Sequence, residues 1–129
     1  MNMRANFESL TTLMRSGDNE ECWQRYYSED VVRRYTNVKP WVGREACRQR
    51  VQEFLDGLTS TPRVEWKTVA FDDDNQVSIF EIYHEFSHKA YGDIRQTEVH
   101  VQRWRDGKIY DESVYLMPLN EEADSEACS

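Results

Sequence analysis

Three ionisable side chains of this 129-residue chain fall within long runs of alternating polar and apolar residues. They are His84, His100 and Glu112, and His88 lies close after the first of them. Imidazole titrates near neutral pH, and a carboxylate beside it fixes its tautomer and raises its basicity. If one face brings these groups together, His84, His100 and Glu112 are candidate catalytic residues for acid–base chemistry on a small molecule.

The alternating runs read QVSIFEIYHEFSHKA, then QTEVHVQRW, then KIYDESVYLM, and they are joined by YGDI and RDGK. Period-two alternation over such lengths predicts consecutive antiparallel strands, and Gly92-Asp93 and Asp106-Gly107 supply the turns. These strands occupy residues 76–117 and must position the candidate groups.

The second turn decides which residues face each other across the last two strands. A three-residue turn, Arg105-Asp106-Gly107, would place Trp104 opposite Lys108 and His100 opposite Glu112. A two-residue Asp106-Gly107 turn would instead place His100 opposite Ser113. We favour the three-residue turn because it collects more of the apolar and ionisable residues on one face.

That face is predicted to line a small-molecule pocket, since it combines apolar walls with a few polar groups. Strand alternation places even-numbered residues of the first run on it, and helix and loop residues close it. The predicted pocket residues are Tyr35, Trp23, Phe54, Phe80, Ile82, Phe86, Gln102, Trp104, Tyr110, Val114 and Leu116. The competing interpretation is that each histidine is a hydrogen-bonded core or rim residue.

The opposite face of these strands is also apolar, and its residues need cover. It carries Val77, Ile79, Tyr83, Val99 and Val101. An exposed apolar patch of this kind usually marks an oligomer interface. We therefore expect a homodimer that forms through the outer face of the sheet.

The residues upstream of this sheet are mainly helical by their spacing. Helices are expected over about 4–15, 18–27 and 44–58, strands over 31–35 and 63–71, and a loop over 37–41. Segregated helices followed by an antiparallel sheet predict an α+β domain, a cone-shaped curved sheet wrapped around N-terminal helices. One domain is expected over 1–119, followed by an acidic disordered tail over 120–129.

Composition excludes several other classes. The net charge of −8 disfavours nucleic acid as a partner, because backbone phosphate is met by clustered Lys and Arg. Three cysteines without metal-ligand spacing predict neither a disulfide framework nor a zinc site, and they favour the cytoplasm. No run approaches the ~18 apolar residues that a membrane helix needs, so no membrane partner is expected. The chain suggests no metal and no cofactor.

Three segments resemble the nuclear transport factor 2-like superfamily, and within it the SnoaL-like proteins related to ketosteroid isomerase. They read SGDNEECWQRYYSEDVV, WVGREACRQRVQEFL and VQRWRDGKIYDESVYL, and the resemblance covers nearly everything from Phe7 to Met117. It implies a cystatin-like roll. Members include isomerases, cyclases, dehydratases and non-catalytic modules, so the resemblance leaves the activity open.

The isomerase site of that family does not carry over. Where its general-base aspartate would lie, this chain has VVRRYTN, with Arg34 or Tyr35 nearest, and its oxyanion-hole tyrosine is matched by Leu10. Its second donor, a protonated aspartate, is matched by His100. The late aspartate of the polyketide cyclases has no counterpart in 114–119. Of the two dehydratase histidines only one is matched, by His84 or His88.

Two function classes therefore remain open. In the first, His100 or His84, oriented by Glu112, acts as base or acid on a small apolar carbonyl or hydroxyl compound, and Tyr35 or Tyr110 donates to the oxyanion. This would be a cofactor-independent isomerase, cyclase or dehydratase. In the second, the domain is a non-catalytic ligand-binding or dimerisation module, and His84 and His100 satisfy each other.

Overall fold

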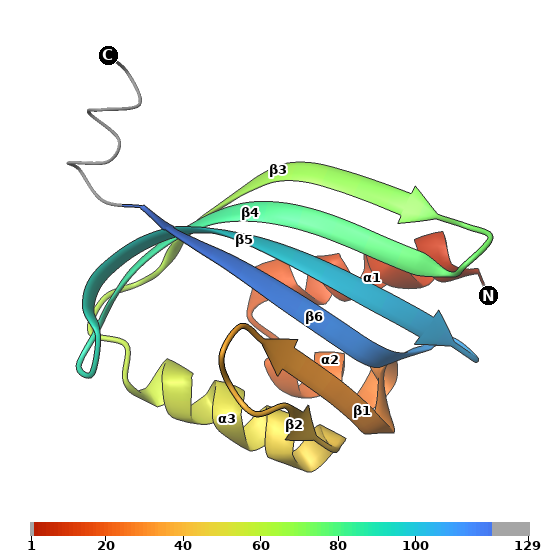
Figure 1. The fold of residues 1–129 in the computed structure, drawn as a ribbon, viewed down its shortest axis with the longest axis horizontal. Helices are drawn as coiled ribbons and strands as arrows, with labels where there is room; N and C mark the ends of the chain where they lie inside the picture. Colours follow the sequence, from red (N-terminus) through yellow and green to blue (C-terminus); the bar gives the residue numbers. More distant parts are fainter. Residues whose placement is uncertain (1, 120–129) are drawn as a thin grey trace.

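The computed structural model describes residues 2–119, which form three helices and six strands (Figure 1). The elements are α1 (Met3–Ser16), α2 (Asn19–Tyr26), β1 (Tyr27–Tyr35), β2 (Trp41–Val42), α3 (Arg44–Asp56), β3 (Arg63–Asp72), β4 (Val77–His88), β5 (Gly92–Arg105) and β6 (Lys108–Leu119). This confirms the predicted α+β class. The predicted acidic tail lies outside the described residues.

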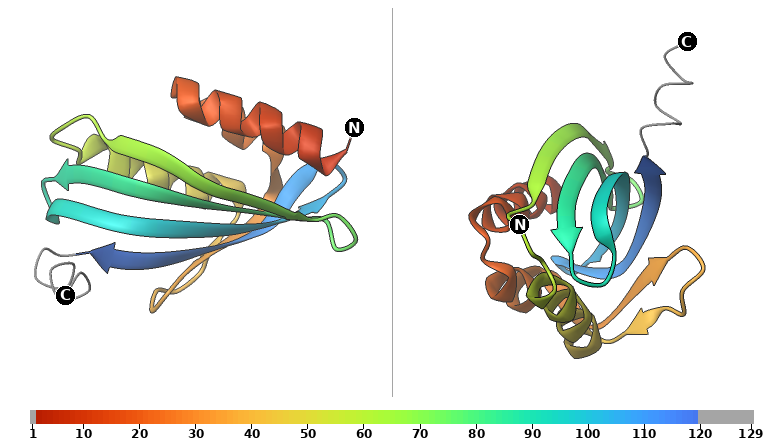
Figure 2. Two further views of the ribbon diagram at one scale, coloured as in Figure 1. Left: turned by 90° about the horizontal axis from the view of Figure 1, so that it is seen from above. Right: turned by 90° about the vertical axis from the view of Figure 1, so that its left-hand side faces the viewer.

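The six strands form one curved sheet in the order β2-β1-β6-β5-β4-β3. The three helices lie on its concave side, where the strongly bent β3, β4 and β5 arch over them (Figure 2). The expected cone therefore forms, with the helices closing its inner side. None of the helices within residues 2–119 has the length and apolar character needed to cross a membrane.

Local capping explains where the first two helices begin. The side chain of Asn2 accepts a hydrogen bond from the Ala5 amide, and the side chain of Asp18 accepts one from the Glu21 amide at 3.2 Å. Gly17 ends α1 in the left-handed conformation, at φ 81°, which favours glycine. Both helices bury apolar residues, which include Phe7 and Leu10 of α1 and Trp23 and Tyr26 of α2.

The sheet is mixed, which corrects the expectation of a purely antiparallel one. β1 pairs with β6 in parallel, with Arg33 opposite Glu112. β1 is also longer than predicted, since it begins at Tyr27 rather than Val31, and the expected loop contains the short strand β2. Local alternation does not specify the partner of a strand that is distant in sequence, so the parallel pair was missed.

The turn between β5 and β6 corrects the predicted register. Asp106 and Gly107 form a two-residue turn with φ of 53° and 78°, and Arg105 faces Lys108. Positive φ at both positions matches the twist of the flanking strands. A bulge then follows on β6, next to the turn.

Because of the bulge, neither predicted pairing is found. His100 faces Val114, and Glu112 faces Gln102. The two-residue turn displaces the preferred pairing by one position and the bulge displaces it by one more. A displacement of two leaves the parity of the pairing unchanged. His100, Gln102, Glu112 and Val114 still share the concave face, and all four are buried.

The core fills the space between the concave face and the helices. Phe80 and Leu10 are fully buried there, and Phe7 packs edge-on against Phe71 at 5.2 Å between ring centroids. The other large members of this cluster are Trp23, Tyr26, Tyr27, Ile82, Trp104 and Ile109. The polar network described next therefore lies beside a well-packed apolar interior.

Candidate functional site

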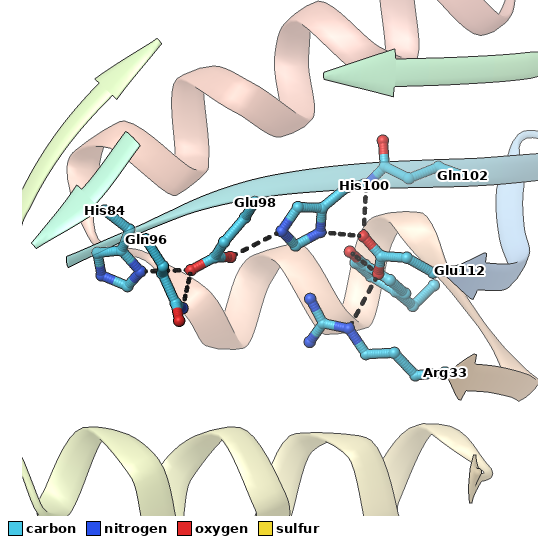
Figure 3. A network of polar contacts seen from close by, with 8 residues as sticks. Arg33, His84, Gln96, Glu98, His100, Gln102 and Glu112 are labelled. Carbon is cyan, nitrogen blue, oxygen red and sulfur yellow. Dashed lines mark hydrogen bonds and ion pairs between the residues drawn. The ribbon is translucent and has the colours of Figure 1, made fainter. Parts of the chain in front are cut away.

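Glu112 is the centre of a buried polar network on the concave face (Figure 3). Its Oε1 accepts a hydrogen bond from the Tyr27 hydroxyl at 3.0 Å. Its Oε2 is bonded to His100 Nδ1 at 2.9 Å and accepts one from Gln102 Nε2 at 3.0 Å. Arg33 Nε forms an ion pair with Oε1 at 3.3 Å. A fully buried carboxylate on β6 thus has four polar neighbours, two from β1 and two from β5.

The network continues from His100 along the same face. His100 Nε2 lies 3.0 Å from Glu98 Oε1, and Glu98 Oε2 lies 2.6 Å from His84 Nδ1. Gln96 Nε2 also donates to Glu98, at 2.9 Å. Arg33, Glu112, His100, Glu98 and His84 therefore form a continuous chain in which carboxylates alternate with cationic or imidazole groups, as Figure 3 shows.

A second set of hydrogen bonds fixes the orientation of Gln102. Trp104 Nε1 donates to Ser78 Oγ at 2.8 Å, and Ser78 Oγ donates to Gln102 Oε1 at 2.9 Å. The amide nitrogen of Gln102 must then face Glu112. Trp104, Ser78 and Gln102 are all buried, and their hydrogen bonds to one another fix the direction from which Gln102 donates to Glu112.

Charge stabilisation dominates the electrostatics of the network. Burial alone would raise the pKa of Glu112, but Arg33 and His100 outweigh it and lower this pKa to about 2. Burial likewise opposes ionisation of Glu98, yet hydrogen bonds from His100 and His84 hold its pKa well below the usual range. Both carboxylates are therefore ionised near neutral pH.

His100 is held as an imidazolium. Burial would lower its pKa, but its hydrogen bonds to Glu112 and Glu98 raise the pKa above the ordinary value. An ionised carboxylate can only accept hydrogen bonds, so both ring nitrogens of His100 must donate. The ring also stacks on Phe80 at 4.4 Å between centroids. With both N–H groups engaged, His100 has no free lone pair for a substrate proton.

His84 lies at the outer end of the network and differs from His100. Its Nδ1 faces Glu98, whereas its Nε2 has no hydrogen-bond partner among residues 2–119. The rings of Phe54 and Phe86 lie next to it, at 6.4 and 4.7 Å between centroids. One nitrogen is thus oriented by a carboxylate and the other is available.

The three predicted catalytic residues lie in one network, but their connections differ from the expectation. Glu112 contacts His100 directly and reaches His84 only through Glu98. The two histidines are bridged by that carboxylate and do not satisfy each other. His88 lies apart from the network: its Nε2 faces the backbone carbonyl of Phe54 at 3.0 Å.

The predicted pocket residues fall into two groups. The first group packs in the core and consists of Trp23, Phe80, Ile82 and Trp104. The second group lies on or against the concave side of the sheet and consists of Tyr35, Phe54, Phe86, Gln102 and Val114.

Tyr110 and Leu116 are not enclosed as expected. The bulge on β6 gives the buried position to Ile109, and Arg105 lies over the ring of Tyr110 at 4.4 Å. Leu116 is 39% exposed. Neither side chain contributes to the polar network.

The sequence interpretation missed Glu98, Arg33 and Tyr27. Glu98 has the same parity as His100 on one strand, so the alternation contained the signal for it. Arg33 and Tyr27 meet Glu112 only through the parallel pairing of β1 with β6. No local pattern indicates that pairing.

A hollow of about 520 Å³ lies at the end of the β4–β5 hairpin, away from Glu112. Of the predicted pocket residues, Phe86 alone belongs to its lining, and Arg63, Glu85, Asp93 and Arg95 make that lining polar. Within residues 2–119, no group of three or more His, Cys, Asp or Glu side chains is arranged to hold a metal ion.

A curved sheet that wraps three helices is the architecture of the nuclear transport factor 2-like superfamily. The sequence model of the SnoaL-like domain matches residues 7–112. The chain belongs to the SnoaL-like domain family. No curated protein matches it.

Solved structures share the fold at low sequence identity. A SnoaL-like protein from Mesorhizobium loti superposes with a TM-score of 0.75 at 22% identity, covering 89% of this chain and 99% of the other. An LEH-like epoxide hydrolase from M. tuberculosis gives 0.68 at 12% identity, covering 88% and 80%. A nuclear transport factor 2-like protein of unknown function from Burkholderia xenovorans gives 0.68 at 16%, covering 92% and 85%.

Proposed function

We propose that the protein catalyses proton transfer on a small, largely apolar carbonyl or hydroxyl compound, with His84 as the general base or acid. The observation that carries this proposal is the position of His84. Glu98 orients its Nδ1 at 2.6 Å, and its Nε2 has no partner among the described residues. A carboxylate that orients one imidazole nitrogen and leaves the other available is the usual arrangement of a catalytic base.

The rest of the network supports a positioning role for His100 and Glu112. His100 is protonated between two carboxylates. It therefore holds the side chain of Glu98 in place and stabilises the negative charge of Glu98. Glu112 in turn stabilises that imidazolium. Tyr35, on the concave side, is the residue that would donate to a developing oxyanion. The reaction class would be an isomerisation, cyclisation or dehydration that needs no cofactor.

Names among the fold relatives agree with small-molecule chemistry without identifying it. One relative is named an epoxide hydrolase, and another, from Streptomyces galilaeus, is named for a hydroxylase. Those names belong to those proteins, and their low identity to this chain supports the fold alone.

The test is hydrogen–deuterium exchange at carbon next to a carbonyl, followed by NMR in D₂O over a panel of small ketones. The protein is expected to accelerate exchange for at least one member, and His84→Asn is expected to lower the rate by about 10²–10⁴-fold. His88→Asn is the matched control, because His88 contacts a backbone carbonyl outside the network. Equal exchange rates in the wild-type protein and His84→Asn would exclude His84 as the base.

A non-catalytic ligand-binding module is the second candidate. Its support is that Trp23, Phe80 and Trp104 pack in the core, and that the 520 Å³ hollow lies away from the network. For this function, ligands from the same panel would raise the melting temperature by mass action while no exchange occurs.

We also propose a homodimer through the convex face of the sheet. Ile79, Tyr83, Val99 and Val101 are half-buried on that face, and Tyr115 is 55% exposed beside them. We also propose a cytoplasmic location. Its support is that Cys22 and Cys47 are buried and form no disulfide, as is usual in a reducing compartment.

Sedimentation is expected to give twice the mass of the chain, and Val101→Lys should reduce it to the monomer mass. The reason is that this substitution places a charge at the centre of the convex face, where a partner would bury it. Tyr91→Lys, at the exposed β4–β5 turn, is the control. A wild-type monomer at high concentration would contradict the dimer.

A further inference from the structure

Arg33 is a buried cation whose hydrogen-bonding capacity is largely unused. The residue is only 9% exposed, yet no hydrogen bond joins its guanidinium to any of residues 2–119. Its only charged contact there is the ion pair between Nε and Glu112 at 3.3 Å, and Nε itself has no hydrogen-bond partner. In Figure 3 its two terminal nitrogens point away from Glu112, in the direction of the Glu98 end of the network.

The terminal nitrogens of a guanidinium carry four N–H donors. Within residues 2–119, Nε of Arg33 is the only fully buried side-chain nitrogen or oxygen without a hydrogen-bond partner, so the terminal nitrogens, which also lack one, retain some accessible surface. Glu112 does not meet them, since its oxygens already accept from Tyr27 and Gln102 and contact His100. The chain therefore presents an ordered, charged donor fork that its own residues do not use.

Aromatic rings flank the same guanidinium and limit what can reach it. Its central carbon lies 5.7 Å from the ring centroid of Trp23 and 5.7 Å from that of Tyr35. The hydroxyl of Tyr35 likewise has no hydrogen-bond partner within residues 2–119. Burial raises the pKa of this hydroxyl, so it remains a neutral donor. A planar acceptor between these rings could bond to both Arg33 and Tyr35.

From these contacts we propose that the site takes a small molecule that carries a carboxylate, and that the carboxylate binds the terminal nitrogens of Arg33, with the Tyr35 hydroxyl as a second donor. This inference rests on the proposed function only in taking the ligand to be the small molecule on which His84 would act. A planar carboxylate matches one guanidinium fork bidentately. A phosphate dianion fits less well, because Glu112 and Glu98 already balance the charges of Arg33 and His100.

The experiment compares benzoate with benzamide, which has the same shape without the charge. Titration calorimetry of the full chain is expected to show benzoate binding at least tenfold more tightly. Arg33→Lys keeps the charge beside Glu112 but removes the fork, and it should weaken benzoate binding about ten- to hundredfold. Arg34→Lys is the matched control, because Arg34 is the next residue of β1 and bonds to Asp111 at the surface. It should bind benzoate like the wild-type protein.

Two further measurements keep the proposal testable if Arg33→Lys does not fold. Tyr35→Phe removes one hydroxyl and should weaken benzoate binding severalfold without affecting benzamide. In the wild-type protein labelled with [¹⁵N]arginine, benzoate should shift the guanidinium signal of Arg33 and leave that of Arg34 in place.

Equal binding of benzoate and benzamide would overturn the proposal. So would an unshifted Arg33 signal, or the absence of binding by benzoate, cyclohexanecarboxylate and hexanoate alike. His84→Asn separates this result from the proposed catalysis. If the wild-type protein and His84→Asn both bind benzoate but the wild-type protein exchanges no ketone, the catalytic proposal fails and the carboxylate site remains. Exchange without carboxylate binding would overturn the carboxylate site and leave the proposed catalysis in place.

Discussion

Glu112→Gln is expected to lower the free energy of unfolding by about 3–5 kcal/mol, because it leaves Arg33 and the imidazolium of His100 buried without their shared counter-charge. Glu112 is fully buried, with Arg33 at 3.3 Å and His100 at 2.9 Å. An amide preserves the shape of the side chain, so the loss reports its charge rather than a cavity. Urea unfolding followed by tryptophan fluorescence at pH 7 measures it.

The matched control is Asp111→Asn, the same chemical change one residue earlier on β6. Asp111 pairs with Arg34 at 3.2 Å and Arg103 at 3.5 Å, and both arginines are about half exposed. Exposed pairs of this kind contribute about 0–1 kcal/mol, so the control should lose at most that. Similar losses for the two variants would mean that the network contributes no more than a surface ion pair.

A partial rescue would identify the source of the effect. In Arg33→Met combined with Glu112→Gln, the orphaned cation is removed together with its counter-charge. This double variant is expected to be more stable than Glu112→Gln alone, because a buried pair replaced by apolar groups often costs little. The non-additive part of the cycle measures the coupling between the two residues.

The parity of the strands was predictable from the sequence, while their register was not. A run such as EVHVQRW specifies which side chains share a face, because successive residues of a strand point to opposite sides. It therefore placed His84, His100 and Glu112 together correctly. The turn at Asp106-Gly107 and the bulge after it decide the exact neighbours, and the predicted pairing of His100 with Glu112 was displaced by two residues.

The contact between His100 and Glu112 survives that displacement for a physical reason. On one face of an antiparallel pair, a residue lies within reach of long side chains on the diagonal positions as well as directly opposite. Glu112 is diagonal to His100 and bonds to it at 2.9 Å. A parity prediction can therefore be right about a contact when the register behind it is wrong.

Arg33 and Tyr27 could not be predicted from the sequence by the same reasoning. They approach Glu112 because β1 joins the sheet in parallel beside β6, about eighty residues away along the chain. Alternation within VVRRY is too short to specify a partner strand. The unused donors of Arg33 belong to the part of the site that this long-range pairing builds. A carboxylate site at Arg33 therefore could not be predicted from the sequence.

The stability of the protein should decline on both sides of neutral pH, with a different group responsible on each side. On the acid side, the pKa of Glu112 is about 2 in the folded state and 4.5 ordinarily, so the unfolded chain binds more protons between those values. Stability from Glu112 is present above pH 4.5 and is lost as the pH falls toward 2. Glu98, whose pKa is also lowered, adds to this loss.

On the alkaline side, His100 gives the opposite sign. Its pKa is raised in the folded state, so its contribution is fully present below the ordinary value of 6.5 and is lost as the pH rises through the folded value. The charged groups that face His100 are Glu98, Glu112 and Arg33. The positive charge of the imidazolium lies between the two carboxylates and offsets their mutual repulsion. Each pH unit in that window should cost up to about 1.4 kcal/mol.

His100→Gln tests this assignment, because glutamine cannot hold a proton between Glu98 and Glu112. Urea unfolding at pH values from 5 to 10 should show a steep alkaline decline for the wild-type protein and a shallower one for His100→Gln. His88→Gln is the control: its imidazole faces the Phe54 carbonyl and no carboxylate, so it should retain the wild-type slope. If His100→Gln retains that slope as well, the proton does not reside on His100, and this histidine would regain the free nitrogen that a general base requires.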